Sequence, residues 1–431
     1  MRPPRALPAA HFDRNERYAY FGERTLTPMD SRADVFVYDA IRTPRGRGKS
    51  AGKLHIQSPL GLLTCLLQAL LGRYPSVGHS TDEVIVGCCE QFNDQGGNLA
   101  RSAALNAGYK VETPGLMVSR FCGSGLDAVN VATAKIMARQ ADLVISGGVE
   151  MLSLVPIFGS GGPMASDISF KDSTVQIPQG LCADLIATIQ GYSRRDVDAL
   201  GAASQQRASL AWGKGWFSKS VIPIRDSASN PILIKDELVR ENVTAESLSM
   251  LRPAFEEAGK AYAHYIRFRY PSVAKIRHVH HAGNSSGIAD GAAAVLLGSR
   301  RAADLLGVKP RARIVATGSA ADDPCIMLTA PAAAVRKALD RAGLSFGDID
   351  LFEVNEAFAS VVLYFMEKTG VPLDRINVAG GSIAMGHPVG ATGAILVGTL
   401  VDELQRRGLE YGLVTMCTGL GMGVATILQS V

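Results

Sequence analysis

The sequence predicts an α/β protein built from two related halves, with a less regular segment between them. Short apolar runs rich in β-branched residues alternate with helical stretches through residues 34–151 and again from residue 289 onward. Such alternation is typical of buried strands joined by helices. In both halves a strand, a glycine-rich turn, a helix and a second strand follow one another, at SRFCGSGLDAV and at AGGSIAMGHPVGATGA. The two halves are therefore predicted to be an internal repeat.

Along the first half the alternation is regular. Residues 34–41 predict a strand, residues 58–71 a helix, and residues 82–89 and 115–119 two further strands. Residues 152–288 differ, because polar helices and charged loops replace the short apolar runs. We expect this middle segment to be an inserted domain or a long excursion from the repeat.

Composition and charge exclude some classes of protein. The chain has 431 residues, of which 47% are hydrophobic and 19% charged, and its net charge is +4 with both signs interspersed. No basic run is interleaved with aromatic residues, so we expect no nucleic-acid partner. No apolar run reaches the roughly 18 residues of a membrane span, so we expect no membrane partner.

Cysteine usage predicts a reducing compartment. The seven cysteines are odd in number and contain no CxxC pair. We expect a cytoplasmic protein, with the mitochondrial matrix as the alternative. Residues 1–32 are expected to be an N-terminal extension, and the acidic Asp13, Glu16 and Glu23 argue against a transit peptide.

Cys122 occupies an unusual place for a cysteine. It follows a predicted strand and stands at the start of a helix that begins at Gly123 to Gly125. A helix N-terminus favours a thiolate, and its free N–H groups can hold an oxyanion. From this segment alone, an inert buried cysteine at a strand end remains an equal alternative.

Three more polar side chains stand at predicted strand ends or turns. His387 lies in a glycine-dense turn before an apolar helix and can act as a base near neutral pH, although a lone histidine in a turn is more often structural. Asn355 follows a strand and suits the N-cap of a helix that ends at Gly370. Cys417 stands where a strand meets another glycine turn. Ligands of α/β sheets usually bind at this edge.

His278, His280 and His281 form the one histidine cluster. No acidic residue or cysteine is near them in sequence, so we favour ordinary packing over a metal site and expect no metal.

Taken together, the motifs CGSG, NEAF, GHPVGATGA and CTGLGMG resemble those of the thiolase family, of the non-sterol-carrier type, in order and approximate spacing. RTPRGRG and AGNSSGIADGAAA fit the same resemblance. It implies the thiolase fold, two βαβαβαββ halves in a five-layered αβαβα core. The implied domains are residues 33–151 with 289–308, a loop domain over 152–288 that binds coenzyme A, and residues 309–431.

The resemblance also implies roles for single residues. Cys122 would be the nucleophile that carries the acyl group, and His387 would accept its proton or that of coenzyme A. Asn355 would hold a water that, with His387, polarises a thioester oxygen. Cys417 would give or take the α-proton, and the N–H groups of Cys122 and Gly419 would form a second oxyanion hole.

By the same resemblance, Ser286, Met327 and Phe358 would contact coenzyme A. The protein would be an acyltransferase that cleaves 3-oxoacyl-CoA with coenzyme A in a degradative role, and a homodimer or homotetramer. Coenzyme A and acyl-CoA would be substrates, with no permanently bound cofactor.

Two departures from the family pattern concern the acyl group. Acetoacetyl-CoA thiolases commonly have His-Met-Gly where this chain has Pro178-Gln179-Gly180, and residues 255–281 are longer than in many relatives. We therefore favour medium, branched or cyclic acyl chains. A biosynthetic acetoacetyl-CoA thiolase is the alternative, followed by a ketoacyl synthase and a non-catalytic acyl-CoA-binding protein.

Overall fold

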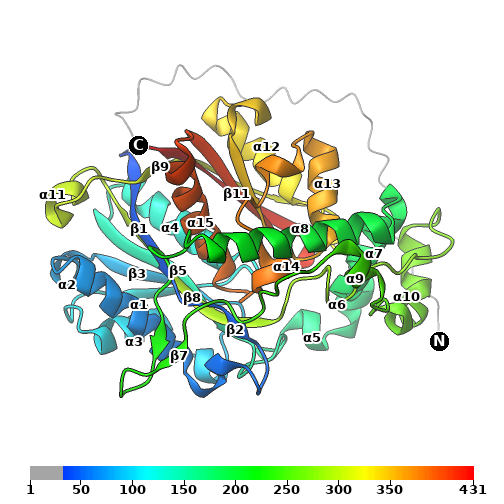
Figure 1. Ribbon diagram of the computed structural model, residues 1–431, viewed down its shortest axis with the longest axis horizontal. Helices are drawn as coiled ribbons and strands as arrows, with labels where there is room; N and C mark the ends of the chain where they lie inside the picture. The colour runs from blue at the N-terminus through cyan, green and yellow to red at the C-terminus, as the bar shows by residue number, and fades with distance from the viewer. Residues whose placement is uncertain (1–32) are drawn as a thin grey trace. The chain divides into compact units, whose positions relative to one another are not determined.

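The computed structural model describes residues 33–431, and the predicted extension over residues 1–32 lies outside them (Figure 1). A single ten-stranded sheet runs through both halves. In spatial order its main strands are β10 (Leu351–Val354), β11 (Tyr411–Thr418), β12 (Met422–Ser430), β9 (Ala312–Ala321), β1 (Val35–Arg42), β8 (Ala289–Gly298), β5 (Leu143–Met151), β3 (Glu83–Gly87) and β4 (Gly115–Val118), with β2 (Gly46–Arg47) beside β8.

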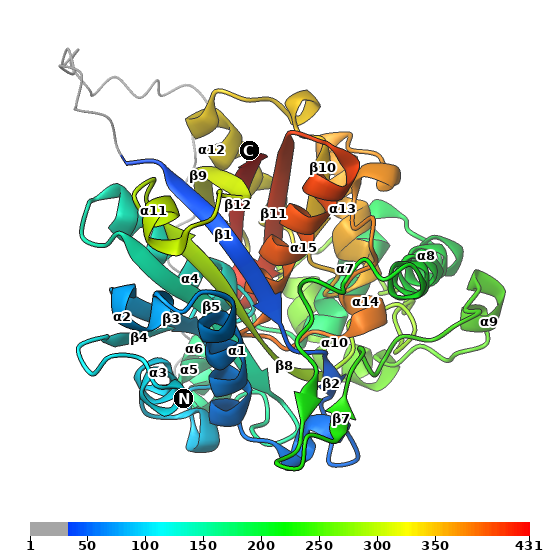
Figure 2. The same ribbon diagram turned by 60° about the vertical axis from the view of Figure 1, so that its left-hand side comes forward.

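Strand β1 joins the two halves. It pairs antiparallel with β8 of the first half along most of its length, and its first residues also pair antiparallel with β9, with Val35 opposite Ile314. The pairs β3–β4, β3–β5 and β10–β11 are parallel, as expected for strands connected by helices. Each half therefore contributes its own set of strands to one continuous path (Figure 2).

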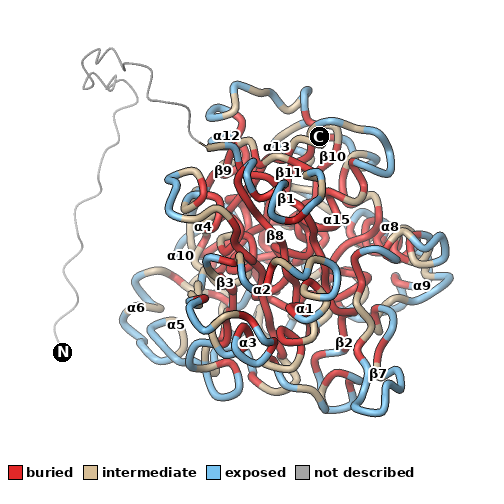
Figure 3. Tube along the Cα trace, turned by 90° about the vertical axis from the view of Figure 1, so that its left-hand side faces the viewer, coloured by how far each residue is buried: buried red, intermediate tan, exposed pale blue. Residues whose placement is uncertain are grey.

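Helices complete five layers. Two helices, α4 (Ser124–Met137) and α15 (Thr392–Arg407), share one hydrophobic core with strands of both halves. The outer face of the first half is covered by α1 (Pro59–Arg73) and α3 (Leu99–Ala107). That of the second half is covered by α12 (Pro331–Ala342) and α13 (Ala359–Thr369). The predicted thiolase fold is thereby confirmed, and Figure 3 shows the buried strands and α15 at its centre.

The middle segment forms mostly helices. Its elements are α5 (Pro163–Ser166), α6 (Ile168–Ser173), α7 (Gln179–Gln190), α8 (Arg194–Gly213), β6 (Ile224–Arg225), β7 (Pro231–Leu233), α9 (Ala245–Ser249) and α10 (Glu256–Arg269). Helix α8 packs against α14 (Ser382–Met385) through Ala208 and Ala384 (Figure 1). Residues 33–431 form one compact unit, and the predicted domain limits within it stay a prediction.

Short elements complete the chain. They are α2 (Val77–Ser80), α11 (Ala302–Leu306) and the 3-10 turns η1 (Lys53–Ile56), η2 (Asn93–Gln95), η3 (Phe346–Asp348), η4 (Leu373–Arg375) and η5 (Gly419–Gly421). Across residues 33–431, none of the helices combines the length and the apolar character that a membrane crossing requires.

Backbone contacts without side chains hold the His387 turn on the start of α4. A Cβ atom added to Gly125 would lie 2.6 Å from the Gly390 carbonyl oxygen, and one added to Gly148 would lie 2.0 Å from it. A Cβ atom on Gly393 would lie 2.3 Å from the Leu126 nitrogen. Only glycine permits approach this close, which explains why both turns are glycine-rich.

The strand predicted before the His387 turn is not formed. A single bridge joins Ile376 to Phe352 of β10, and the Asn377 side chain then replaces the strand ladder. Its Oδ1 accepts a hydrogen bond from the Val354 N–H, and its Nδ2 donates one to the Val354 carbonyl, both at 2.8 Å. One carboxamide thus supplies the hydrogen bonds that the buried backbone groups at the edge of β10 require.

We predict that Asn377→Leu lowers the free energy of unfolding by about 2–4 kcal/mol, because the Val354 N–H and C=O become buried without partners. Urea unfolding followed by circular dichroism measures the change. Gln140→Leu, at an exposed position, is the control. A loss below about 0.5 kcal/mol in Asn377→Leu would mean that the carboxamide does not replace the ladder.

Candidate active site

Cys122 lies on a strained turn between β4 and α4. Phe121 before it has a φ of 49°, in the left-handed region, and α4 begins two residues after Cys122. A Cβ atom on Gly123 would lie 2.7 Å from Thr418 Cγ2, so the end of β11 packs directly on this turn. The backbone N–H groups of Cys122 and Gly419 both lie near the Cys122 sulfur and lower the pKa of its thiol. Two donors from the two halves of the fold therefore meet at one atom.

Burial decides the charge of Cys122. Desolvation raises the pKa of its thiol to about 11, and the nearby Glu150 carboxylate raises it further, against the two N–H groups and the Gln179 carboxamide. The expectation that the helix N-terminus stabilises a thiolate is therefore outweighed. Cys122 rests as a thiol at neutral pH and must lose its proton when it attacks.

Cys417 lies at the buried end of β11. It is 1% exposed, and desolvation raises the pKa of its thiol, with a further rise from the charge of Cys122. Thr418, the residue after Cys417, packs on Gly123, the residue after Cys122, so the two thiols lie near each other. Cys417 therefore keeps its proton at rest and can donate it to a strongly basic carbon next to Cys122.

The hydrogen bonds of His387 define its tautomer. Its Nδ1 lies 2.6 Å from Thr392 Oγ1, and that hydroxyl donates its own hydrogen to the Pro388 carbonyl at 2.9 Å. Nδ1 must therefore be the protonated nitrogen, which leaves a lone pair on Nε2. Burial lowers the pKa of His387 to about 3, with a second contribution from the charge of Arg45. The ring is thus a neutral base with Nε2 free to accept a proton.

Asn355 is not the N-cap that its sequence context predicts, because α13 begins four residues later, at Ala359. Its side chain instead contacts Ser382 and His387. Oδ1 accepts a hydrogen bond from Ser382 Oγ at 2.6 Å, which turns Nδ2 toward His387 Nε2 at 3.4 Å. Its backbone N–H donates to the Thr415 carbonyl at 3.0 Å, two residues before Cys417. Asn355 thereby links the His387 turn to β11.

The three residues predicted to contact coenzyme A, Ser286, Met327 and Phe358, lie in or beside the hydrophobic cluster of Cys417. Ser286 donates its N–H to the Ala357 carbonyl at 3.0 Å, which places it beside Phe358. Phe358 and the buried Met327 pack in the hydrophobic cluster that contains Cys417. Met327 and Phe358 therefore share a hydrophobic cluster with Cys417, and Ser286 lies beside Phe358.

The three histidines that were predicted to pack rather than to bind a metal each contact a buried aspartate. His278 and His280 each place Nδ1 within 2.8 Å of a carboxylate oxygen of the buried Asp184. His281 Nε2 lies 2.8 Å from Asp198. Within residues 33–431, no group of three or more His, Cys, Asp or Glu side chains is placed to hold a metal ion.

Two polar residues at the site were missed from the sequence. Gln179, the first residue of α7, hydrogen-bonds through its side chain to Cys122, where the family comparison had marked only a departure from His-Met-Gly. Glu150, at the end of β5, is fully buried. The sequence did contain a signal for Glu150, because a carboxylate near the end of an otherwise apolar strand is unusual.

Glu150 ties the segment after β3 to the histidine turn. Its carboxylate accepts hydrogen bonds from the N–H groups of Cys89 and Gly390, both at 2.8 Å, and from Gln95 Nε2 at 2.5 Å. Burial raises the pKa of Glu150 and these donors lower it. Glu150 therefore holds the His387 turn against the segment after β3, and its charge also opposes a negative charge on Cys122.

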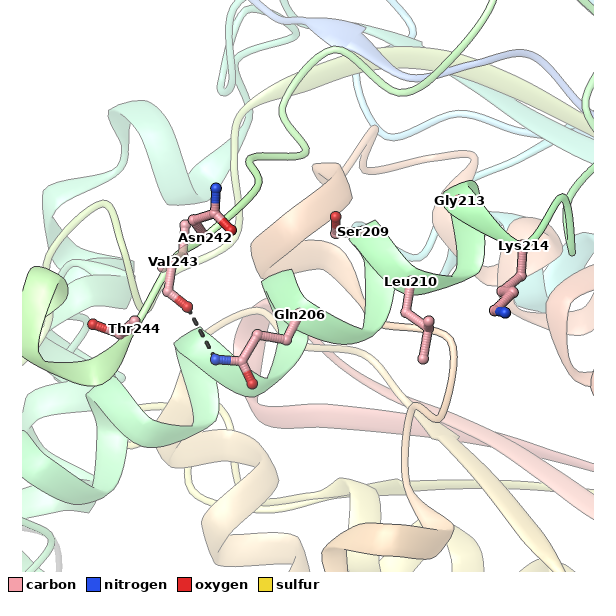
Figure 4. Close-up of a pocket in the computed structure, with 8 residues that line it drawn as sticks. All are labelled: Gln206, Ser209, Leu210, Gly213, Lys214, Asn242, Val243 and Thr244. Carbon is pink, nitrogen blue, oxygen red and sulfur yellow. Dashed lines mark hydrogen bonds between the residues drawn. The ribbon is translucent and has the colours of Figure 1, made fainter.

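An open hollow of about 670 Å³ lies elsewhere, between α8 and residues 242–244 (Figure 4). Gln206 spans it, with Nε2 donating to the Val243 carbonyl at 3.0 Å. Its lining contains none of the four predicted catalytic side chains. This hollow is therefore not the catalytic site.

Comparison with known proteins matches both halves of the chain. Residues 35–265 match the family described as "Thiolase, N-terminal domain", and residues 308–430 match "Thiolase, C-terminal domain". The 3-ketoacyl-CoA thiolase of Cronobacter sakazakii is 38% identical over 404 residues, covering 92% of this chain and 99% of that protein. That of Aliivibrio fischeri is 36% identical over 403 residues, covering 92% and 99%.

Solved structures agree with these matches. Human mitochondrial 3-ketoacyl-CoA thiolase in complex with CoA superposes with a TM-score of 0.80 at 34% identity, covering 93% of this chain and 98% of that one. The acetyl-CoA acetyltransferase of Bacillus anthracis superposes with a TM-score of 0.78 at 31% identity, covering 93% and 100%.

We predict that Gln179→Leu slows alkylation of Cys122 by iodoacetamide at pH 8, roughly threefold to tenfold, because loss of the carboxamide donor raises the thiol pKa and each pKa unit changes the thiolate fraction about tenfold. Mass spectrometry of the Cys122 peptide against time measures the rate. Gln190→Leu, at the other end of α7, is the matched control. An unchanged rate in Gln179→Leu would contradict the assigned hydrogen bond.

Proposed function

The chain belongs to the thiolase family, and on this premise we propose that it cleaves 3-oxoacyl-CoA with coenzyme A, to acetyl-CoA and a shortened acyl-CoA, through an acyl group carried on Cys122. It is an acyltransferase. The observation that carries the proposal is the arrangement around one sulfur atom. The N–H groups of Cys122 and Gly419, from the two halves, act on the Cys122 thiol, and the turn that carries His387, with Asn355 beside it, packs on the first residues of α4, just after Cys122.

The first half-reaction breaks the carbon–carbon bond. His387 Nε2 takes the thiol proton as Cys122 Sγ attacks C3 of the 3-oxoacyl-CoA, and the N–H groups of Cys122 and Gly419 hold the resulting oxyanion. The C2–C3 bond then breaks, and the electron pair passes to the acetyl-CoA enolate. A water held by Asn355, together with the new Nε2–H of His387, stabilises the enolate oxygen. The Cys417 thiol protonates the enolate carbon, and acetyl-CoA leaves.

The second half-reaction restores the enzyme. A proton passes from the His387 imidazolium to the Cys417 thiolate, so that both are neutral again. Nε2 then takes the proton of the coenzyme A thiol, whose sulfur attacks the acyl–Cys122 thioester. The bond to Cys122 Sγ breaks, and the departing thiolate recovers the proton from His387. This is a ping-pong sequence that uses no metal and no redox cofactor.

Helix α10 supports a proposal for the acyl chain. It lies in the long segment that follows Phe255, and its Tyr262 and Tyr265 are half-buried against the cluster that contains Cys417. Tyr270 after it donates its hydroxyl to Asp323 at 2.7 Å, which ties the end of α10 to the segment that carries Met327. An aromatic wall at this place favours medium, branched or cyclic acyl groups. The biosynthetic acetoacetyl-CoA reaction is the alternative.

A panel of substrates decides between these classes. Thiolysis of acetoacetyl-CoA, 3-oxodecanoyl-CoA, 3-oxohexadecanoyl-CoA and a steroid-derived 3-oxoacyl-CoA is followed by kcat/KM. A preference for acetoacetyl-CoA would overturn the proposed acyl class. Cleavage of none of them would overturn the activity and leave an acyl-CoA-binding protein. Light scattering on the same sample tests the proposed homodimer or homotetramer.

We predict that the two cysteines separate the half-reactions. Cys122→Ala removes the acyl carrier, so thiolysis and the exchange of acetyl groups between acetyl-CoA and labelled coenzyme A both fall by at least about 10³-fold. Cys417→Ala removes only the proton donor, so thiolysis falls by about 10²–10⁴-fold while acetyl exchange continues. Product release and isotope exchange are followed by liquid chromatography. Equal loss of both reactions in Cys417→Ala would refute its role as the α-proton donor.

A further inference from the structure

Arg45 is a charged side chain buried directly behind the His387 turn. It is 1% exposed, and no step of the proposed reaction uses it. Its Nη1 donates a hydrogen bond to the Gly386 carbonyl at 2.8 Å, the residue that precedes His387. Although RTPRGRG forms part of the family resemblance, nothing in that motif implied a contact with a turn 341 residues away.

The backbone around His387 is held on both sides. Gly386 has a φ of 96°, which a residue with a side chain rarely adopts, and its carbonyl is held by Arg45. On the other side, the His387 N–H donates to the Gly287 carbonyl at 2.8 Å. Loss of either bond would let the turn, and with it the imidazole ring, move relative to Asn355.

The charge of Arg45 is only partly compensated. Its backbone N–H donates to Asp236 Oδ1 at 2.7 Å, but that carboxylate also forms a two-pronged ion pair with Arg42, at 2.7 and 2.9 Å. Burial lowers the pKa of Arg45 to about 10, so the guanidinium stays charged at neutral pH. Glu353 and Glu356 interact with it, yet burial raises the pKa of each, which reduces their charge.

Burial is the first cause of the low pKa of His387, and Arg45 is the charged neighbour that adds to it. Within its own turn, Thr392 is a neutral partner, and Asn355 of the neighbouring element is also neutral. Cys122, just before α4, and Cys417 of β11 are thiols that stay protonated at neutral pH. Glu150 of β5 accepts a hydrogen bond from the Gly390 N–H. The other two carboxylates are Glu353 on β10 and Glu356 just after it. After burial itself, the charge of Arg45 is what acts on His387.

We propose that Arg45 is a positioning residue for His387, which fixes the Gly386 carbonyl and places a permanent positive charge behind the imidazole so that the ring remains uncharged at rest. A neutral ring keeps the Nε2 lone pair available for the thiol proton of Cys122 or of coenzyme A. The same charge makes the transient imidazolium a stronger acid, which returns the proton to the leaving sulfur. The inference deepens the proposed function, and its kinetic consequences rest on that function.

A direct test reads the charge of His387 without an assay of activity. The protein is labelled with [¹³C-ε1]histidine, and the His387 line among the eight histidines is identified by its loss in His387→Asn. The spectrum is recorded between pH 4.5 and 9 for the wild type, Arg45→Gln, Arg45→Lys and Arg47→Gln. Arg47 is the matched control, because it belongs to the same motif but is exposed.

We expect the wild-type, Arg45→Lys and Arg47→Gln lines to stay at the neutral-imidazole position down to about pH 5. In Arg45→Gln, loss of a nearby positive charge raises the midpoint by about one unit, from about 3 to about 4, so at pH 4.5 the line has moved about a quarter of the way toward the imidazolium position while the wild-type line has moved only a few per cent. An Arg45→Gln line that follows the wild type overturns the proposal. If Arg45→Gln does not fold, a wild-type His387 that titrates near pH 6 overturns it, and one that stays neutral while Arg45→Lys also stays neutral supports it.

Thiolysis measured on the same variants gives the second readout. At pH 7.5, kcat/KM of Arg45→Gln is expected to lie about threefold to tenfold below that of the wild type, because the Gly386 carbonyl loses its donor and the transient His387 imidazolium becomes a weaker acid. If the wild type cleaves no 3-oxoacyl-CoA but the NMR result holds, the proposed function fails and the role of Arg45 stands. If thiolysis occurs and kcat/KM of Arg45→Gln matches that of the wild type, the role of Arg45 fails and the function stands.

Discussion

The site depends on a contact between backbones that only glycine allows. The turn that carries His387 lies on the first residues of α4, where Gly125, Gly148 and Gly390 leave no room for a Cβ atom. Because Cys122 stands immediately before α4, this contact sets its distance from the His387 turn. Glu150 also holds the His387 turn, because its carboxylate binds the N–H of Gly390 together with that of Cys89 in the segment after β3. The position of the nucleophile relative to its base is therefore a property of the core rather than of a loop.

Burial gives this site an uncharged resting state. Desolvation keeps Cys122 and Cys417 as thiols and His387 as a neutral imidazole, so no thiolate–imidazolium pair exists before substrate binds. The fixed N–H groups of Cys122 and Gly419 then meet charge only where the reaction creates it. Arg45 and Glu150 act in the same direction, since one opposes a cation on His387 and the other an anion on Cys122.

Much of this arrangement was predictable because it is local. The helix after Cys122 begins at Ser124, within the predicted range, and the buried helix after His387 begins at Thr392. Asn355 shows the limit of local reasoning. Its place after a strand predicts an N-cap, but Ser382 and His387, which lie close to it only in the folded chain, bind its carboxamide. Asn377 likewise replaces a predicted strand with one side chain, which no periodicity can reveal.

The sequence by itself determined the α/β repeat, the strand ends that carry the reactive side chains, and the family to which their motifs belong, since periodicity, glycine turns and motif order are all written within short stretches of chain. Only the tertiary structure decided the protonation states and the supporting contacts of those side chains. Gln179, Glu150 and Arg45 reach the site from distant segments, and desolvation depends on everything packed around an atom. A pKa is therefore a property of the folded surroundings, which short stretches of sequence do not contain.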